Sequence, residues 1–252
     1  MAFGMAIGTR SYARGFLSSS GLPPGIRGLL IANVAIFLAN FFLGGALRGV
    51  FGLAALRPTD VVQHLYAWQL VTYMFLHGGI GHILFNMLAL WMFGTEFERL
   101  WGTRRFLRFY FFCGVGAGLC VIVGGYLFGN PYVATVGSSG AIYGILLASA
   151  VLWPDRQMLF YFLIPIKMKY FVAIIGAIAF LNSFNPASPV SEVAHLGGML
   201  FGYIFLKSAR VRSFDAMGTL RGAYRQWKIE RAKKKFQVYM RRHGSDQDRR
   251  PH

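Results

Sequence analysis

The sequence predicts an all-α membrane protein, a bundle of six transmembrane helices. Of its 252 residues, 55% are hydrophobic and only 14% are charged, and the mean hydropathy is +0.47. A soluble domain normally has about 25% charged residues, so this composition favours a protein that crosses a membrane several times. The hydrophobic residues also gather in separate runs, most of them near the length that spans a bilayer.

The first three apolar runs are separated by segments that contain charge. Residues 28–45 form a run about long enough to cross a bilayer. Segment 46–79 mixes charged and aromatic residues, and we expect a long loop in the membrane interface, where aromatic side chains are enriched. Residues 81–97 form the second run and residues 106–128 the third, with a charged cluster at 96–105 between them.

The last three runs are separated by links that contain proline. The fourth run covers residues 138–153 and stops before Pro154, because proline rarely continues a helix. An apolar piece broken by Pro165 follows, and we expect it to lie in the interface. The fifth run covers residues 170–184 and the sixth covers residues 192–206.

Basic residues predict the orientation of these helices. Six spans put both chain ends and the links at 96–105 and 154–169 on one side, which then holds nearly all Lys and Arg. The opposite side has only Arg48 and Arg57, so the positive-inside rule predicts that both termini are cytoplasmic. The fourth and sixth helices then both start near the outer face.

We expect three parts: a cytoplasmic N-terminal segment 1–24, a six-helix domain 25–207 and a basic cytoplasmic tail 208–252. The tail holds 13 of the 26 Lys and Arg residues in a chain of net charge +17. It is expected to lie on anionic lipid headgroups, where each basic side chain contributes about 1 kcal/mol. Nucleic acid is not an expected partner, because the other basic residues lie between or beside the apolar runs.

Ser139 stands at the start of the fourth run. A lone membrane serine most simply bonds its own backbone or a neighbouring helix, but this one lies between Gly137 and Gly140. Small residues let another helix approach closely, and the start of a helix favours negative charge that develops nearby. Ser139 is therefore a candidate nucleophile, although the sequence hardly separates it from Ser138.

His195 stands at the start of the sixth run. A single membrane histidine can serve as a proton relay or a structural hydrogen-bonding group. Here Gly198 and Gly202 follow three and seven residues later, so they share a helix face that can pack against the glycines after Ser139. The imidazole would then lie beside the hydroxyl, take its proton and later protonate a leaving amine.

His82 and Asn86 lie four residues apart in the second run and face the same way. They either hold helices together or donate hydrogen bonds to an oxyanion, and the nearby serine and histidine favour the oxyanion role. Losing one such donor typically costs about 3–4 kcal/mol in the transition state. Tyr143, one turn after Ser139, would stack on the imidazole of His195.

Acidic and metal-binding groups are scarce near these residues. None of the nine Asp and Glu lies in the core of a predicted membrane helix. Glu192 is the one nearest His195 in the chain, and we expect it at most to touch the ring from the side, so the prediction is a Ser–His dyad without an acidic third member. The H-E-x-x-H motif of zinc proteases is missing, and no metal, nucleotide or organic cofactor is expected.

At these residues the sequence closely resembles the rhomboid intramembrane serine proteases over about residues 25–207. The motifs stand in separate places in the right order: YMFLHGGI at 73–80, HILFN at 82–86, E-x-x-W-G at 98–102, GSSGAIYG at 137–144 and AHLGGMLFG at 194–202. One departure is visible in the first loop, where many members carry Trp-Arg and this chain carries Trp68 and Gln69.

The resemblance implies a six-helix bundle in which Ser139, and not its neighbour, is the nucleophile and His195 is the base. It also implies that His82, Asn86 and the backbone N–H of Ser139 form the oxyanion hole. The expected activity is a serine endopeptidase that cleaves other proteins in or near their transmembrane segments. The alternative is a non-catalytic relative that binds or escorts membrane proteins, and such relatives lack Ser or His.

The remaining predictions concern transport, which the sequence does not favour, and the membrane in which the protein lies. A small-solute transporter would show inverted repeats or broken helices with a midplane site, and the sequence shows neither. We expect a bacterial inner membrane. The alternative is the mitochondrial inner membrane, because residues 1–23 contain two arginines, several serines and no acid, as transit peptides do.

Overall fold

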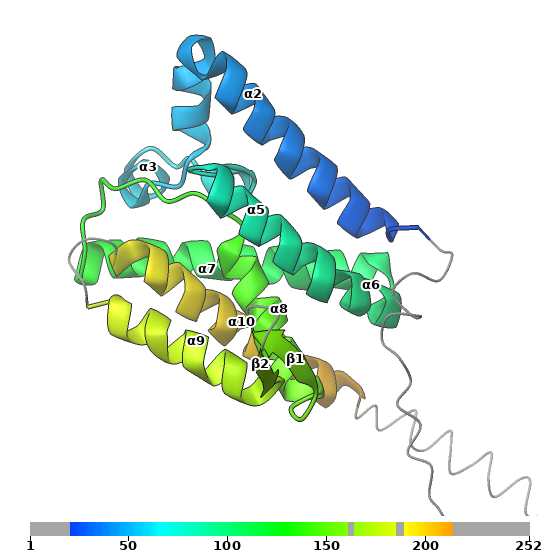
Figure 1. Cartoon of the computed structure of the whole chain (residues 1–252). Helices are drawn as coiled ribbons and strands as arrows, with labels where there is room; N and C mark the ends of the chain where they lie inside the picture. The colour runs from blue at the N-terminus through cyan, green and yellow to red at the C-terminus, as the bar shows by residue number, and fades with distance from the viewer. Residues whose placement is uncertain (1–20, 161–163, 185–188, 214–252) are drawn as a thin grey trace, which may run out of the picture. The chain divides into compact units, whose positions relative to one another are not determined.

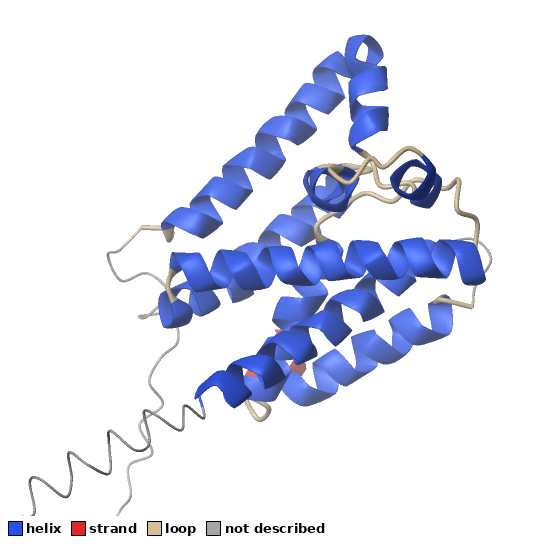
Figure 2. Ribbon diagram, turned by 180° about the vertical axis from the view of Figure 1, so that it is seen from behind, coloured by secondary structure: helices blue, strands red, loops and turns tan. Residues whose placement is uncertain are grey.

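The computed structural model describes residues 21–160, 164–184 and 189–213, and most of these lie in helices (Figures 1 and 2). The chain divides into two compact units, Met1–Ile204 and Phe205–His252. The site below belongs to the first unit. Most of the predicted N-terminal segment and most of the basic tail fall outside the described residues.

The N-terminal part begins with a long helix, α2 (Pro24–Ala54). Its apolar portion, up to Ala46, is long enough to cross a membrane. The first loop (residues 55–79) then holds three short helices. They are α3 (Pro58–Gln63), α4 (Gln69–Thr72) and η1 (Tyr73–Phe75). The expected loop at 46–79 is thus partly wrong, because α2 continues through the first nine residues of that segment and much of the remainder is helical.

The second predicted run forms one continuous helical segment with a change of winding. It consists of α5 (Ile80–Ala89), a π-helical turn η2 (Leu90–Gly94) and α6 (Thr95–Trp101). Together they are long enough to cross a membrane. Gly102 ends α6 with a φ of 76°, a conformation that glycine adopts at little cost. Helix α7 (Thr103–Leu127) follows at once.

The C-terminal part contains three helices and a small hairpin. Helix α8 (Ser139–Leu152) leads to the antiparallel strands β1 (Gln157–Phe160) and β2 (Ile164–Lys167), which contain most of the piece expected in the interface. Helices α9 (Met168–Asn182) and α10 (Pro189–Ser213) complete the order. Each predicted run therefore falls on a helix, and the all-α membrane class is confirmed.

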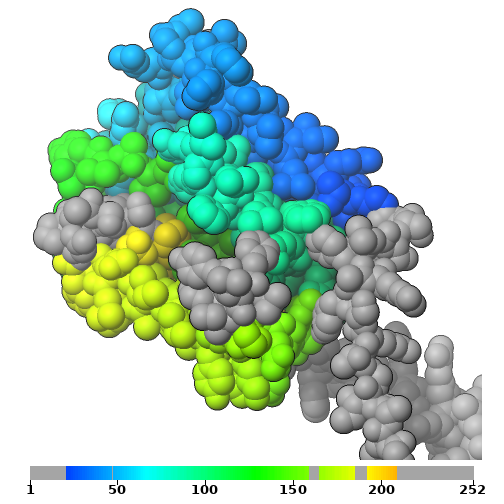
Figure 3. Space-filling model, viewed as in Figure 1, coloured from blue at the N-terminus to red at the C-terminus, as the bar shows by residue number. Residues whose placement is uncertain are grey.

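Two of these helices carry large apolar side chains on their outward faces. Phe42 of α2 is 74% exposed and Phe85 of α5 is 71% exposed. Figure 3 shows α2 and the α5–α6 segment as neighbouring bands of one surface. Large exposed apolar areas are rare on soluble monomers, so these faces are suited to contact with lipid.

At one end of the bundle, the buried carboxylate of Glu98 holds the start of α2. Its two oxygens accept the backbone N–H groups of Gly25 at 2.8 Å and Ile26 at 2.7 Å, and Oε1 also accepts the hydroxyl of Thr103 at 2.6 Å. The first N–H groups of a helix lack partners within the helix, and a negative charge is favourable there. One side chain thus links α2 to the corner between α6 and α7.

Ion pairs add to the same end. Arg156, just before β1, pairs with Glu96 of α6. Lys167 and Lys169 donate to Oδ1 of Asp155 at 3.2 and 2.9 Å. The hydrogen bonds from Lys169 and then Lys167 lower the pKa of the Asp155 carboxyl, which therefore stays ionised beside them. The links that the sequence assigned to the basic side do meet at one end of the bundle.

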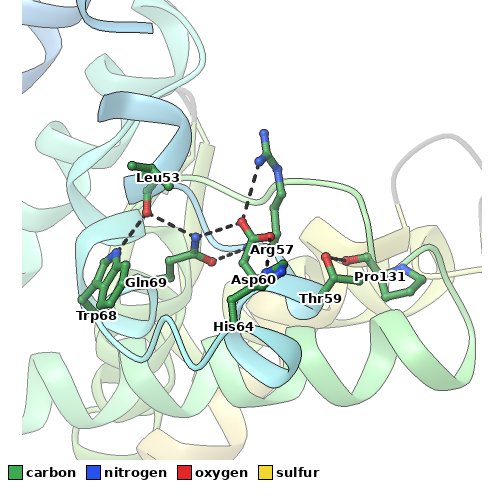
Figure 4. Close-up of polar contacts among 8 residues, drawn as sticks. All are labelled: Leu53, Arg57, Thr59, Asp60, His64, Trp68, Gln69 and Pro131. Carbon is green, nitrogen blue, oxygen red and sulfur yellow. Dashed lines mark hydrogen bonds and ion pairs between the residues drawn. The ribbon is translucent and has the colours of Figure 1, made fainter. Parts of the chain in front are cut away.

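At the other end, Gln69 is fully buried and joins parts of the first loop (Figure 4). Its Oε1 accepts the N–H of Arg57 at 3.0 Å, and its Nε2 donates to the Leu53 carbonyl at 3.2 Å and to Asp60 Oδ2 at 3.1 Å. The indole N–H of Trp68 donates to the same Leu53 carbonyl at 3.1 Å. The Trp-Gln pair of this chain thus anchors the loop.

The first loop is also bonded to the serine loop (residues 129–138), which links α7 to α8. Leu56 and Thr135 exchange two backbone hydrogen bonds, at 3.0 and 2.8 Å. Thr59 donates its N–H and its hydroxyl to the Pro131 carbonyl at 3.2 and 3.3 Å (Figure 4). These bonds hold the path of the chain as it enters the first turn of α8.

Helices α7 and α8 pack closely through small residues. A Cβ atom on Gly140 would lie 2.5 Å from the Cβ of Ala117, and one on Gly144 would lie 2.6 Å from the Sγ of Cys113. Real Cβ atoms essentially never come this close to another heavy atom. The glycines after Ser139 therefore serve helix packing on this side.

Candidate functional site

Ser139 is the first residue of α8, and the chain reaches it through an unusual turn. Gly137 has a φ of 121°, where a side chain would be strained. Its N–H donates to the Tyr73 carbonyl at 2.9 Å, which ties the turn to the first loop. Ser138 is buried behind it, whereas Ser139 is partly exposed. The two serines that the sequence left open are thus in different surroundings.

The imidazole of His195 lies against the hydroxyl of Ser139. The distance from His195 Nε2 to Ser139 Oγ is 2.9 Å, within hydrogen-bond range. Helices α8 and α10 cross closely enough for this because glycine faces glycine. A Cβ on Gly202 would lie 3.0 Å from the Cα of Gly144, and the Gly198 position is tighter still.

Tyr143 covers one face of the imidazole, as the sequence predicts. The two ring centroids are 4.1 Å apart and the ring planes differ by 3°. Tyr143 stands one turn after Ser139 on α8, so the same helix supplies the hydroxyl and the stacking ring. The stacking restricts rotation of the His195 side chain.

The environment of His195 differs from the predicted dyad with no acidic partner, because Glu192 contacts the ring. Its Oε2 lies 3.0 Å from Nδ1 of His195, on the edge of the ring away from the serine. Both side chains are 17% exposed. The physical reason is local, since residues three apart on an α-helix lie on neighbouring positions of one face. The i, i+3 spacing in the sequence was the signal for this contact.

His82 and Asn86 of α5 both approach the turn at Gly137. A Cβ atom on that glycine would lie 2.7 Å from Cε1 and Nε2 of His82 and 3.7 Å from Nδ2 of Asn86. The N–H of Gly78 donates to His82 Nδ1 at 3.4 Å, so Nε2 carries the proton of the neutral ring. Asn86 Nδ2 is buried and has no hydrogen-bond partner within the described residues. Two N–H donors thus converge at the turn that begins two residues before Ser139.

Two further residues support this region without having been assigned a role from the sequence. Tyr73 is buried, accepts the N–H of Gly137 and donates its hydroxyl to the Gly114 carbonyl at 2.7 Å. His77 is also buried, and its ring packs edge-on against His82 with 5.1 Å between centroids. Tyr73 acts through its backbone carbonyl and His77 through its ring, and neither kind of contact can be recognised from a pattern in the sequence.

The arrangement combines a hydroxyl, a base and donors, as acyl transfer requires. Oγ of Ser139 faces a nitrogen of His195, and the first N–H groups of α8 have no partner within the helix. His82 and Asn86 add side-chain donors. In the part of the chain that the structure describes, no three His, Cys, Asp or Glu side chains gather as a metal ion would need.

Comparison with models of known protein families identifies the family of this chain. The model of the Rhomboid domain matches residues 64–209. This range contains Ser139, His195, His82 and Asn86. The chain belongs to the rhomboid family. The family resemblance read from the sequence motifs is confirmed.

Three named rhomboid relatives are 30–36% identical over the matched segments. "Rhomboid protease GluP" of Bacillus subtilis (strain 168) is 36% identical over 152 residues, 60% of this chain and 28% of that protein. "Rhomboid-like protease 5" of Toxoplasma gondii is 33% identical over 172 residues, 65% of this chain and 18% of that protein. "RHOMBOID-like protein 6, mitochondrial" of Arabidopsis thaliana is 30% identical over 174 residues, 65% of this chain and 50% of that protein. The match thus spans half or less of each of these three rhomboid relatives.

Proposed function

We propose that this protein is an intramembrane serine endopeptidase, which hydrolyses peptide bonds in or near transmembrane segments of other proteins. The observation that carries the proposal is the 2.9 Å contact between Ser139 Oγ and His195 Nε2. Membership of the rhomboid family and the protease names of two relatives support it.

In the first step, Oγ of Ser139 attacks the scissile carbonyl carbon while its proton moves to Nε2 of His195. The carbonyl oxygen becomes an oxyanion, which accepts hydrogen bonds from His82 Nε2–H, Asn86 Nδ2–H and the backbone N–H of Ser139. When the intermediate collapses, the C–N bond breaks and the imidazolium gives its proton to the leaving amine. An acyl-enzyme ester on the serine remains.

In the second step, water attacks the ester carbonyl while His195 takes one of its protons. The same donors hold the second oxyanion. Collapse breaks the C–Oγ bond, and the imidazolium returns a proton to the serine oxygen. Ser139 and His195 are then as they started, and the second product carries a new carboxylate.

The substrate class follows from where this chemistry takes place. Ser139 stands at the start of α8, next to the two polar loops at one end of the bundle, where water can reach it. A helical substrate keeps its carbonyls in its own hydrogen bonds, so it must enter laterally and unwind locally. The resemblance to the rhomboid proteases suggests single-pass substrates with small residues at the cut and helix-weakening residues after it.

We propose a multi-pass membrane protein whose two termini are cytoplasmic, with the division into 1–24, 25–207 and 208–252 expected from the sequence. The polar links lie at one end of the bundle, and the two loops joined by hydrogen bonds lie at the other. This arrangement supports helices that cross the membrane in alternating directions. A bacterial inner membrane is the proposed location. A mitochondrial inner membrane is the alternative that the name of the Arabidopsis relative keeps open.

The test uses the full chain in lipid vesicles with a model transmembrane substrate. We expect Ser139→Ala and His195→Ala each to abolish cleavage, and a fluorophosphonate probe to label only the chain that keeps Ser139. Ser149→Ala is the matched control, because the hydroxyl of this buried serine of the same helix donates to the Ile145 carbonyl one turn before it. Cleavage retained in either single variant refutes the mechanism. No cleavage and no labelling of the unaltered chain would favour the non-catalytic alternative.

A further inference from the structure

We infer that Glu192 is a positioning residue that orients His195 and selects its reactive tautomer, an inference that rests on the proposed function. The 3.0 Å contact between Glu192 Oε2 and His195 Nδ1 is the starting observation. Both side chains belong to α10 and are equally shielded, at 17% exposure. The base would then have an acidic partner where the sequence led us to expect none.

The first step of the argument concerns the proton of the neutral ring. A neutral imidazole carries one N–H, and its other nitrogen has the lone pair. Nε2 of His195 must have the lone pair to receive the proton of Ser139, so Nδ1 must carry the N–H. A carboxylate only accepts hydrogen bonds, and Glu192 is ideally placed to accept this one. The contact therefore favours the tautomer that can act as a base.

The second step concerns the charge that forms during reaction. When the proton of Ser139 reaches Nε2, His195 becomes an imidazolium while its Nδ1–H stays in place. The ionised Glu192 then lies next to a positive ring in surroundings that are partly shielded from water, where opposite charges attract more strongly than in bulk solvent. The carboxylate keeps its charge and takes no proton.

The third step is geometric. Three contacts restrain the imidazole: Ser139 at Nε2, Glu192 at Nδ1 and the ring of Tyr143 over one face. The serine and the tyrosine come from α8, whereas the glutamate comes from the helix that carries the histidine. Glu192 therefore holds the ring even when a substrate or an acyl group occupies the serine oxygen.

A purely structural role is the competing explanation. Glu192 lies in the first turn of α10, where a negative charge stabilises the positive end of the helix dipole. Such a role predicts a change in stability when the charge is removed. It predicts no change in kcat per folded molecule and no change in which ring nitrogen of His195 carries the proton, and these differences are the basis of the two tests.

The kinetic test compares Glu192→Gln with the unaltered chain in lipid vesicles. The glutamine oxygen still accepts the Nδ1–H, so orientation is kept and only the charge is lost. We expect kcat per folded molecule to fall about tenfold with little change in KM, because a neutral neighbour stabilises the imidazolium that forms in the transition state less. Glu192→Leu also removes the acceptor, and we expect a loss of about a hundredfold.

The control is Glu96→Gln, which removes a glutamate charge at the opposite end of the bundle, where the side chain pairs with Arg156. We expect its kcat and KM to match those of the unaltered chain. If Glu192→Gln changes only the melting temperature and leaves kcat unchanged, the inference is wrong. If the unaltered chain cleaves normally in that experiment, the proposed function stands without it.

A second measurement needs no catalysis. With 15N-labelled histidine, the signals of His195, assigned by comparison with His195→Ala, report which ring nitrogen carries the proton. We expect the Nδ1–H tautomer in the unaltered chain and in Ser139→Ala, and a mixture of tautomers in Glu192→Leu. A proton found on Nε2 in the unaltered chain at neutral pH would overturn the inference.

Discussion

The backbones of Gly140 and Gly198 approach so closely that a Cβ atom on Gly198 would overlap the carbonyl oxygen of Gly140. One turn further along both helices, Gly144 and Gly202 repeat the close approach. This crossing of α8 and α10 brings the side chains of Ser139 and His195 within reach of one another. The smallest residues of the bundle thus determine the distance between the two polar groups.

Gly198→Ala tests this crossing. We expect the added methyl group to force α8 and α10 apart, to lower the free energy of unfolding by about 1–3 kcal/mol, and to reduce cleavage about a hundredfold through misplacement of His195. Denaturant unfolding in detergent and substrate cleavage measure the two effects. Gly176→Ala is the control, since a Cβ there would only make ordinary contact with Met199. Normal cleavage by Gly198→Ala would contradict the predicted dependence.

Asn86→Ala tests the proposed oxyanion donor. Its buried Nδ2 has no partner in the described part of the chain, so little is lost from the free protein when the amide is removed. We expect kcat to fall by about 10²–10³ with little change in KM, the usual cost of one oxyanion donor. Asn33→Ala is a suitable control, because this buried asparagine donates to the Leu29 carbonyl within α2. A loss in KM alone would argue against the donor role.

Tyr143 distinguishes ring stacking from hydroxyl chemistry. Tyr143→Phe keeps the parallel ring 4.1 Å from the imidazole centroid, and we expect cleavage within about twofold of the unaltered chain. Tyr143→Ala removes the ring, and we expect a decrease of about tenfold, since an aromatic pair contributes about 0.5–1.5 kcal/mol. Both variants are compared by cleavage per folded molecule. A large loss in Tyr143→Phe would assign a role to the hydroxyl instead.

Gln69→Leu tests the anchoring of the first loop. The change removes three hydrogen bonds of a fully buried side chain and leaves backbone groups and Asp60 with fewer partners. We expect a loss of about 2–4 kcal/mol in the free energy of unfolding, measured by denaturant titration in detergent. The exposed Gln63 of α3 is the matched position, and Gln63→Leu should change stability by less than about 0.5 kcal/mol. Equal effects of the two variants would contradict the anchoring role.

Local pattern was sufficient to predict the helices and their order. Hydrophobic length located every run, and the proline at 154 marked the end of the fourth within two residues of Leu152. The first loop was harder, because its short helices depend on contacts such as those of Gln69 rather than on a repeated pattern. The hairpin was missed for a similar reason, since its strand pairing from Gln157↔Lys167 to Phe160↔Ile164 joins two short segments across a turn.

By itself, the sequence determined the membrane class, the helical runs and the residues that could carry chemistry, because these depend on composition and spacing along one segment. Only the tertiary structure decided which of those residues meet. Ser139 and His195 are 56 positions apart, and their contact depends on how closely two helices cross. The contact of Glu192 with the other ring nitrogen is local instead, because the i, i+3 spacing on α10 places the two side chains side by side, whereas no spacing along one helix can bring Ser139 to His195.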